Sequence, residues 1–136
     1  MNKKVYLCWQ HYQTKDFLLI ASLTKNENGN YVFKYTKEAL KALQLGCFLP
    51  IPIENPNDIE KEFTSNTLPT FFSQRMLVSS KYIIQKLGLE NMPSDELSIL
   101  TYDYGRRNSD NFYVIDEPTY QKQEEASKKT LKPNNH

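Results

Sequence analysis

The densest group of hydrogen-bonding side chains with fixed geometry lies in one short turn: Arg106, Arg107, Asn108, Ser109 and Asp110. Guanidinium groups are planar forks that match carboxylates or phosphates. Nothing in the turn resembles a nucleophile paired with its base, so it predicts a clamp within the fold or a surface for a partner. Adjacent arginines point apart, so one can pair with Asp110 or Asp103 while the other faces outward. Asp110 can equally bind backbone amides of its own turn.

Arg75 and Trp9 are two further candidates for partner binding. Arg75 lies in the helical pattern Phe71–Met76, so its stem can cover apolar surface while its head group forms an ion pair in the fold or reaches a partner. Trp9 lies within an apolar run that is typical of a strand, which suits a core residue; an exposed tryptophan would be a natural interface anchor. Together with the arginines and the aspartate of the turn, these two residues complete the predicted partner-binding set.

The rest of the sequence offers no catalytic constellation. Of the two histidines, His136 lies in the C-terminal tail, and His11 falls in a predicted surface loop where only Asp16 is a nearby acid. The four glycines are scattered singly, which excludes a glycine-rich phosphate loop. Cys8 and Cys47 lie in apolar surroundings without metal-ligand spacing, which indicates buried free thiols in a reducing cytoplasm. We therefore expect a protein that is not an enzyme and binds neither a cofactor nor a metal.

Length and charge limit the class of protein further. A chain of 136 residues fits one domain, which we place at residues 1–118. Residues 119–136 are polar, mixed in charge and poor in apolar side chains, which predicts a disordered tail. A formal net charge of +1 argues against holding nucleic acid by bulk electrostatics. The apolar runs are too short for a signal peptide or a membrane span, so we expect a cytoplasmic protein with no membrane association.

Three N-terminal segments predict an antiparallel meander that would carry Trp9. Val5–Trp9 and Phe17–Leu23 are short continuous apolar runs, typical of strands buried on both faces. Tyr31–Tyr35 alternates aromatic residues with others after a turn-forming Asn-rich stretch, which predicts a half-buried strand. Phe112–Ile115 then predicts a fourth strand, which follows the arginine turn and returns to pair with the meander.

About four short helices are predicted between the third and the last strand. Their expected bounds are Lys37–Leu45 with Thr36 as its cap, Pro69–Met76, a helix from Ser79 or Ser80 that stops at Gly88, and a helix that begins at Ser94. Cys47–Ile53 contains two prolines, which indicates an edge strand or an extended segment. The predicted fold class is α+β, with a small twisted antiparallel sheet of about four strands that is able to curl into a partial barrel.

Several of these segments resemble, in the same order, the N-terminal subdomain of HipA-type toxin kinases. The motifs that carry the resemblance are Gly29-Asn30-Tyr31-Val32-Phe33-Lys34-Tyr35, Phe48-Leu49-Pro50-Ile51, residues 63–72 (FTSNTLPTFF), and Asp95-Glu96-Leu97 through Gly105-Arg106 to Val114. A closer likeness is to the segment that precedes the HIRAN domain in some bacterial proteins. That likeness covers residues 5–118 and depends on Tyr6-Leu7-Cys8-Trp9-Gln10, on residues 71–80 (FFSQRMLVSS) and on residues 105–110 (GRRNSD).

The resemblance implies a non-enzymatic, regulatory role. A free-standing copy of the HipA N-terminal subdomain is similar to the small third protein of tripartite HipBST systems, which is the antitoxin of a separate kinase. A HipA-like kinase core is therefore the expected protein partner, and no kinase activity is expected because the chain stops where a kinase core would begin. The alternative is a nucleic-acid-associated accessory module, suggested by the HIRAN likeness and by Arg75, Arg106 and Arg107, with DNA bound directly or through a DNA-binding partner.

Overall fold

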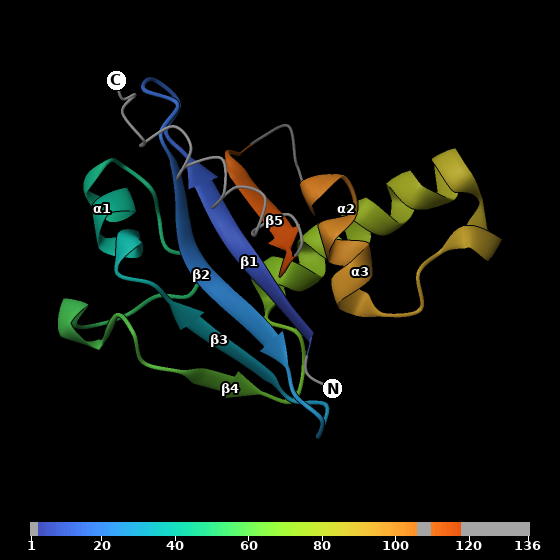
Figure 1. The fold of residues 1–136 in the computed structure, drawn as a ribbon, viewed down its shortest axis with the longest axis horizontal. Coiled ribbons are helices and arrows are strands. Elements are labelled where there is room, and N and C mark those ends of the chain that lie inside the picture. The colour runs from blue at the N-terminus through green and yellow to red at the C-terminus, as the bar shows by residue number, and fades with distance from the viewer. Residues whose placement is uncertain (1–2, 106–109, 118–136) are drawn as a thin grey trace, which may run out of the picture.

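A computed structural model of the chain describes residues 3–105 and 110–117, and it shows an α+β fold built on a small antiparallel sheet (Figure 1). Within these residues the sheet has five strands in the order β4-β3-β2-β1-β5. The strands are β1 (Lys3–Gln10), β2 (Phe17–Lys25), β3 (Tyr31–Tyr35), β4 (Phe63–Ser65) and β5 (Phe112–Asp116). The predicted meander is confirmed, and β5 returns to pair with β1 as expected. The predicted tail, residues 119–136, lies outside the described residues.

The sequence analysis missed one strand, β4. It has only three residues, too few to show an alternating pattern, and it forms because Phe63 lies opposite Phe33 of β3. Cys47–Ile53 is not an edge strand, one of its two predicted alternatives; it is an irregular segment outside the sheet that bends at Pro50 and Ile51. The Tyr35 hydroxyl holds this segment, since it donates to the Ile51 carbonyl at 2.6 Å and accepts the Ile51 N–H at 2.7 Å.

The described residues form three α-helices: α1 (Glu38–Gln44), α2 (Thr70–Leu87) and α3 (Glu96–Thr101). Three single 3₁₀ turns accompany them: η1 (Pro56–Asp58), η2 (Leu89–Asn91) and η3 (Tyr102–Gly105). None of the helices that the structure describes is long and apolar enough to cross a membrane.

The two helices predicted within residues 69–88 are in fact the single helix α2, so the count of about four short helices was wrong. The prediction took Ser79 or Ser80 for a cap, because serine favours helix starts. Serine is nevertheless tolerated within a helix, and neither glycine nor proline interrupts the run before Gly88. Gly88 ends α2 as predicted, with φ of +88°.

The predicted caps of the two shorter helices also need correction. Thr36 does not cap α1 with its side chain; its hydroxyl donates to the Leu19 carbonyl of β2 at 2.6 Å, and the N-cap position is Lys37. In α3 the cap is Asp95 instead of Ser94, because the Asp95 carboxylate accepts the backbone N–H groups of the first turn. Lys3 of β1 forms an ion pair with the same carboxylate and so ties α3 to the sheet.

A β-bulge explains why β2 reads as a continuous apolar run. Leu7 of β1 lies opposite Ala21, whereas Cys8 lies opposite Leu19, so Ile20 is the extra residue. An extra residue breaks the alternation of faces, and Ile20 and Ala21 are both fully buried as a result.

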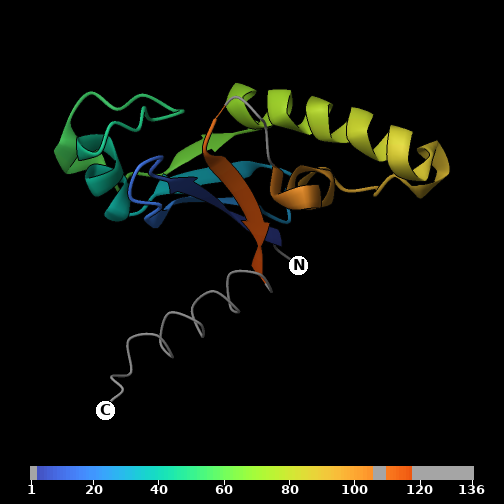
Figure 2. The ribbon, with the colours of Figure 1, turned by 90° about the horizontal axis from the view of Figure 1, so that it is seen from above.

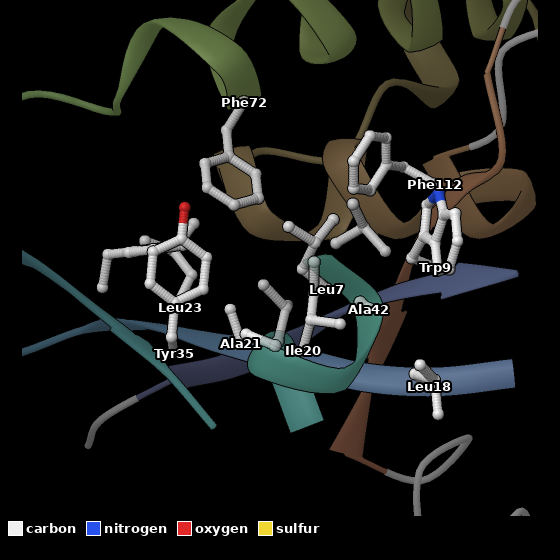
Figure 3. Close-up of a cluster of buried hydrophobic side chains, with 14 of the residues drawn as sticks. Leu7, Trp9, Leu18, Ile20, Ala21, Leu23, Tyr35, Ala42, Phe72 and Phe112 are labelled. Carbon is white, nitrogen blue, oxygen red and sulfur yellow. The ribbon is translucent and has the colours of Figure 1, made fainter. Parts of the chain in front are cut away.

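The main core covers one face of the sheet and contains Trp9. Phe72 of α2 and Ala42 of α1 pack with Leu7 and Leu23 of the sheet in this cluster (Figure 3). A smaller cluster, Tyr6, Cys8 and Ile115, lies on the opposite face. Because alternate residues of a strand point to opposite faces, the two clusters together bury β1 on both sides, as predicted.

Candidate functional site: an arginine clamp at the sheet edge

The first half of α2 and the residues just before β5 bring Arg75 and Asp110 together, although 35 residues separate them in the chain. Arg75 is 1% exposed, and its Nη1 donates to Asp110 Oδ2 at 2.8 Å. Its Nη2 donates to the main-chain carbonyl of Phe112, also at 2.8 Å. One guanidinium group thus binds a carboxylate and a backbone oxygen at the same time, which its planar fork allows and a single ammonium group does not.

Asp110 completes a closed arrangement around Phe112. Its Oδ1 accepts the Phe112 N–H at 3.1 Å, while its Oδ2 accepts from Arg75. The ion pair therefore binds both backbone polar groups of Phe112, in the way that a neighbouring strand would. Because β5 is an edge strand, these groups would otherwise be open to another chain or to water, and capping them blocks the edge at this point. We call Arg75, Asp110 and Phe112 the arginine clamp.

Aromatic side chains surround the arginine clamp. The Phe71 ring lies 5.2 Å from that of Phe112, and the Arg75 guanidinium carbon lies 5.3 Å from the Phe71 ring centroid. Phe48, from the irregular segment after α1, packs edge-on against Phe112 at 5.4 Å and is 63% exposed. Apolar neighbours lower the local dielectric constant, so the ion pair is stronger here than at an open surface.

The structure places the predicted site residues in different surroundings. Arg75 forms a structural ion pair, one of its two predicted alternatives, and Asp110 binds a backbone amide of its own turn as considered. Trp9 is 7% exposed and lies opposite Phe112 in the register of β1 and β5, so it is a core residue beside the arginine clamp. Arg106 and Arg107 lie outside the described residues.

Local sequence reasoning did not find the pairing of Arg75 with Asp110, because it searched for partners of Asp110 only within the neighbouring turn. It also missed Phe48, because its partner Phe112 is distant in the sequence. The sequence did contain one indication of this pairing. Arg75 lies in a helical stretch with apolar residues on both sides, and an arginine that becomes buried needs a counter-charge.

His11 is buried, so the prediction of a surface histidine was wrong. It is 7% exposed, and its ring lies 5.7 Å from that of Trp9 and 5.2 Å from that of Tyr12. Its Nδ1 accepts the Thr14 N–H at 3.1 Å, which fixes the turn between β1 and β2. In residues 3–105 and 110–117, no group of three or more histidine, cysteine or acidic residues could hold a metal ion.

Both cysteines are free and buried, as predicted. Burial, with a smaller contribution from the negative charge of Glu38, raises the pKa of Cys8 to about 12. Burial alone raises the pKa of Cys47 to about 12. The thiolate is the nucleophilic form of cysteine, so neither position supplies a nucleophile at neutral pH.

Comparisons of the chain with protein-family models, with curated proteins and with solved structures found no match.

Proposed function

We propose that this chain is a non-enzymatic protein-interaction module that resembles the HipA N-terminal subdomain and acts as an antitoxin or regulatory partner of a separate HipA-family kinase. The observation that supports the proposal is a contact between two segments of the resemblance. Asp110 lies in the HipA-like closing segment, residues 95–114, and Arg75 follows closely on the HipA-like residues 63–72, within residues 71–80 of the HIRAN-associated likeness. Residues 71–80 supply Arg75 and residues 105–110 supply Asp110, and the two side chains form the buried ion pair. Arg75 and Asp110 thus act together to stabilise the fold.

The arginine clamp is suited to holding a binding surface and poorly suited to chemistry. The guanidinium group of Arg75 is already bound to a carboxylate and a carbonyl oxygen, so its charge is committed inside the protein. Asp110 is likewise committed, with one oxygen on Arg75 and the other on a backbone amide. We propose that Arg106 and Arg107, just before this anchored aspartate in the sequence, contact the kinase, while Arg75, Asp110 and Trp9 support that surface.

The alternative, a nucleic-acid-associated module, has weaker support. Of the three arginines that suggested it, Arg75 is buried and paired, so it does not contact a phosphate in this conformation. The alternative then depends on Arg106 and Arg107 in a chain whose net charge is only +1, which provides little sequence-independent attraction to DNA.

The proposal is tested by co-expressing the tagged full chain with a HipA-family kinase core encoded beside it. We expect a complex that survives nuclease treatment and size-exclusion chromatography and that relieves the toxicity of the kinase. Changing both Arg106→Ala and Arg107→Ala should weaken the complex by about tenfold or more, the scale of a lost interface anchor. The control removes the same number of positive charges elsewhere, at two exposed lysines, Lys37→Ala and Lys41→Ala, and should leave binding unchanged.

Two results would refute the proposed function. The wild-type chain and the kinase core could elute separately, or their association could disappear on nuclease treatment. The second result would favour the nucleic-acid module instead, and binding to a DNA oligonucleotide would then fall steeply as salt is raised.

A further inference from the structure

The smaller buried cluster, on the face of the sheet opposite the main core, is more deeply buried than its strands explain. Tyr6, Cys8 and Ile115 are 8%, 0% and 1% exposed, and the partly buried Leu19 and Tyr113 pack against them. Ile115 lies on β5, an edge strand that has a neighbouring strand on only one side. Neighbours within the sheet do not cover the face of such a strand, so a further layer has to bury this cluster.

The described α-helices do not supply that layer. The helical residues in the two buried clusters all belong to the main core: Ala39, Ala42, Phe72, Leu97 and Leu100. Accordingly, α2 lies along the side of the sheet that carries the main core (Figure 2). Within residues 3–105 and 110–117, the smaller cluster contains strand residues alone.

The chain that follows β5 is tethered at this second face. β5 leads from the level of α2 to the opposite side of the sheet (Figure 2). Glu117, the last described residue, has helical conformation, and its Oε1 accepts a hydrogen bond from the Tyr6 hydroxyl at 2.9 Å. Tyr6 belongs to the smaller cluster, so a segment that begins at Glu117 has a high effective concentration there.

The sequence around and after Glu117 contains the signals of a helix start and stop. Asp116 is a residue type favoured at the N-cap, and Pro118 is tolerated in a first turn. Residues 124–129 (EEASKK) contain two Glu–Lys pairs four residues apart, in the order that stabilises a helix. Residues 128–132 include three lysines, which suit the C-terminal end of a helix dipole, and Pro133 ends the pattern.

The uncharged residues of this segment share one side of such a helix. At 3.6 residues per turn they fall within an arc of about 140° that contains no charged residue. They are Thr119, Tyr120, Gln123, Ala126, Ser127, Thr130 and Leu131. The composition of the tail predicts disorder in isolation, because it has too few apolar residues for a core of its own. A face that is already apolar removes that requirement.

We propose that residues 117–132 form an amphipathic helix whose uncharged side, which includes Tyr120 and Leu131, packs against the smaller cluster. A helix of these residues is about 24 Å long. That length is enough to cross β5, β1 and β2, whose axes together span about 10 Å. The occupant of this face is thus the chain's own C-terminal segment, and the inference does not depend on the proposed function.

The two cysteines of the full chain provide the test. Cys8 belongs to the smaller cluster and Cys47 to the main core, so one thiol is the reporter and the other an internal control. Changing both Tyr120→Glu and Leu131→Glu places charges on the uncharged side while keeping a good helix former. Labelling with iodoacetamide is followed at each cysteine by peptide mass spectrometry. We expect Cys8 to react at least about tenfold faster in this variant, with Cys47 unchanged.

A matched variant controls for the added charge. Gln121→Glu with Lys132→Glu introduces the same residue at the same spacing, one position further along, on the charged side of the helix. It should keep the labelling rate of Cys8 within about twofold of the wild type. Hydrogen exchange gives a second readout, since the amides of residues 121–132 should be protected in the wild type and lose that protection in the Tyr120 and Leu131 variant.

Four results would overturn the inference. Cys8 could react at the wild-type rate in the Tyr120 and Leu131 variant, or both cysteines could accelerate equally, which would mean that the whole fold opens. The amides of residues 121–132 could exchange in the wild type as fast as in a free peptide. Finally, protection of Cys8 could fall on dilution together with a dimer seen by analytical ultracentrifugation, which would assign this face to a second copy.

Discussion

Replacing Arg75 by methionine should destabilise the fold strongly while preserving its shape. Methionine keeps an unbranched side chain that can pack beside Phe71, but it removes the donors that bind Asp110 and the Phe112 carbonyl. The carboxylate and the carbonyl oxygen then lose their partner in largely apolar surroundings. The change therefore tests whether the arginine clamp holds β5 in place.

The expected cost follows from the two contacts. A hydrogen bond that involves a charged group contributes about 1.5–3 kcal/mol, and removing one partner of a buried ion pair costs about 3–5 kcal/mol. Asp110 keeps 22% of its side chain exposed, so water can partly replace the lost arginine. We therefore expect Arg75→Met to lower the free energy of unfolding by about 3 kcal/mol, the low end of that range. Arg75→Lys should cost about half as much, because one ammonium group cannot span both oxygens.

Urea denaturation followed by circular dichroism measures this effect. Lys81→Met is the matched control, since it removes a charge from an exposed position of the same helix and should change stability by less than about 0.5 kcal/mol. Asp110→Asn and the double variant Arg75→Met with Asp110→Asn complete a double-mutant cycle, in which we expect a coupling energy of about 1–3 kcal/mol. A loss below about 1 kcal/mol for Arg75→Met, or simple additivity in the cycle, would refute the reasoning.

Three further predictions concern the rest of the fold. Burial tends to raise the pKa of Asp95, but hydrogen bonds from Lys3, Ser98 and the Leu97 amide outweigh it and lower the pKa to about 2. In the unfolded chain the pKa of an aspartate is about 4. The stability that this cap contributes is therefore complete above about pH 4 and is lost as the pH falls toward 2. Asp95→Ala should cost about 1 kcal/mol at pH 7 and much less near pH 2, as urea titrations at the two values will show. Both buried cysteine thiols should react with Ellman's reagent at pH 8 only after unfolding, and rapid labelling of the native protein would contradict the assigned burial. Phe72→Ala should lower the free energy of unfolding by about 3–5 kcal/mol, as thermal or urea unfolding will show, whereas Phe48→Ala, at a ring that is 63% exposed, should lower it far less. Similar losses for the two variants would contradict the assignment of Phe72 to the core.

The parts of the fold with a local cause were predictable from the sequence. The apolar runs before and after residue 11 indicated β1 and β2, and alternating aromatic residues indicated β3, because burial on one or two faces leaves a period of two or a continuous run. Gly88 marked the end of α2 because few other residues adopt its positive φ. The burial of Cys8 and Cys47 followed from their apolar neighbours in the chain.

The errors arose where the preference of a single residue was outweighed by other contacts, some distant and some local. Thr36 favours a helix cap, yet its hydroxyl donates to Leu19 of the neighbouring strand. Ser79 also favours a helix start, yet it lies buried within α2 because the helix continues past it. The His11 prediction failed for a local reason. The polar stretch of residues 11–16 indicated a surface loop, whereas the rings of two close sequence neighbours, Trp9 and Tyr12, pack against the imidazole.

The sequence alone determined four of the five strands that the structure describes, and the end of α2 at Gly88. Only the tertiary structure decided which arginine pairs with Asp110. Arg75 is 35 residues away from Asp110, and the two can pair only because α2 runs over the sheet edge. Local patterns reflect the period of one helix or strand, whereas an ion pair between two elements depends on their packing, and packing is set by the whole core at once.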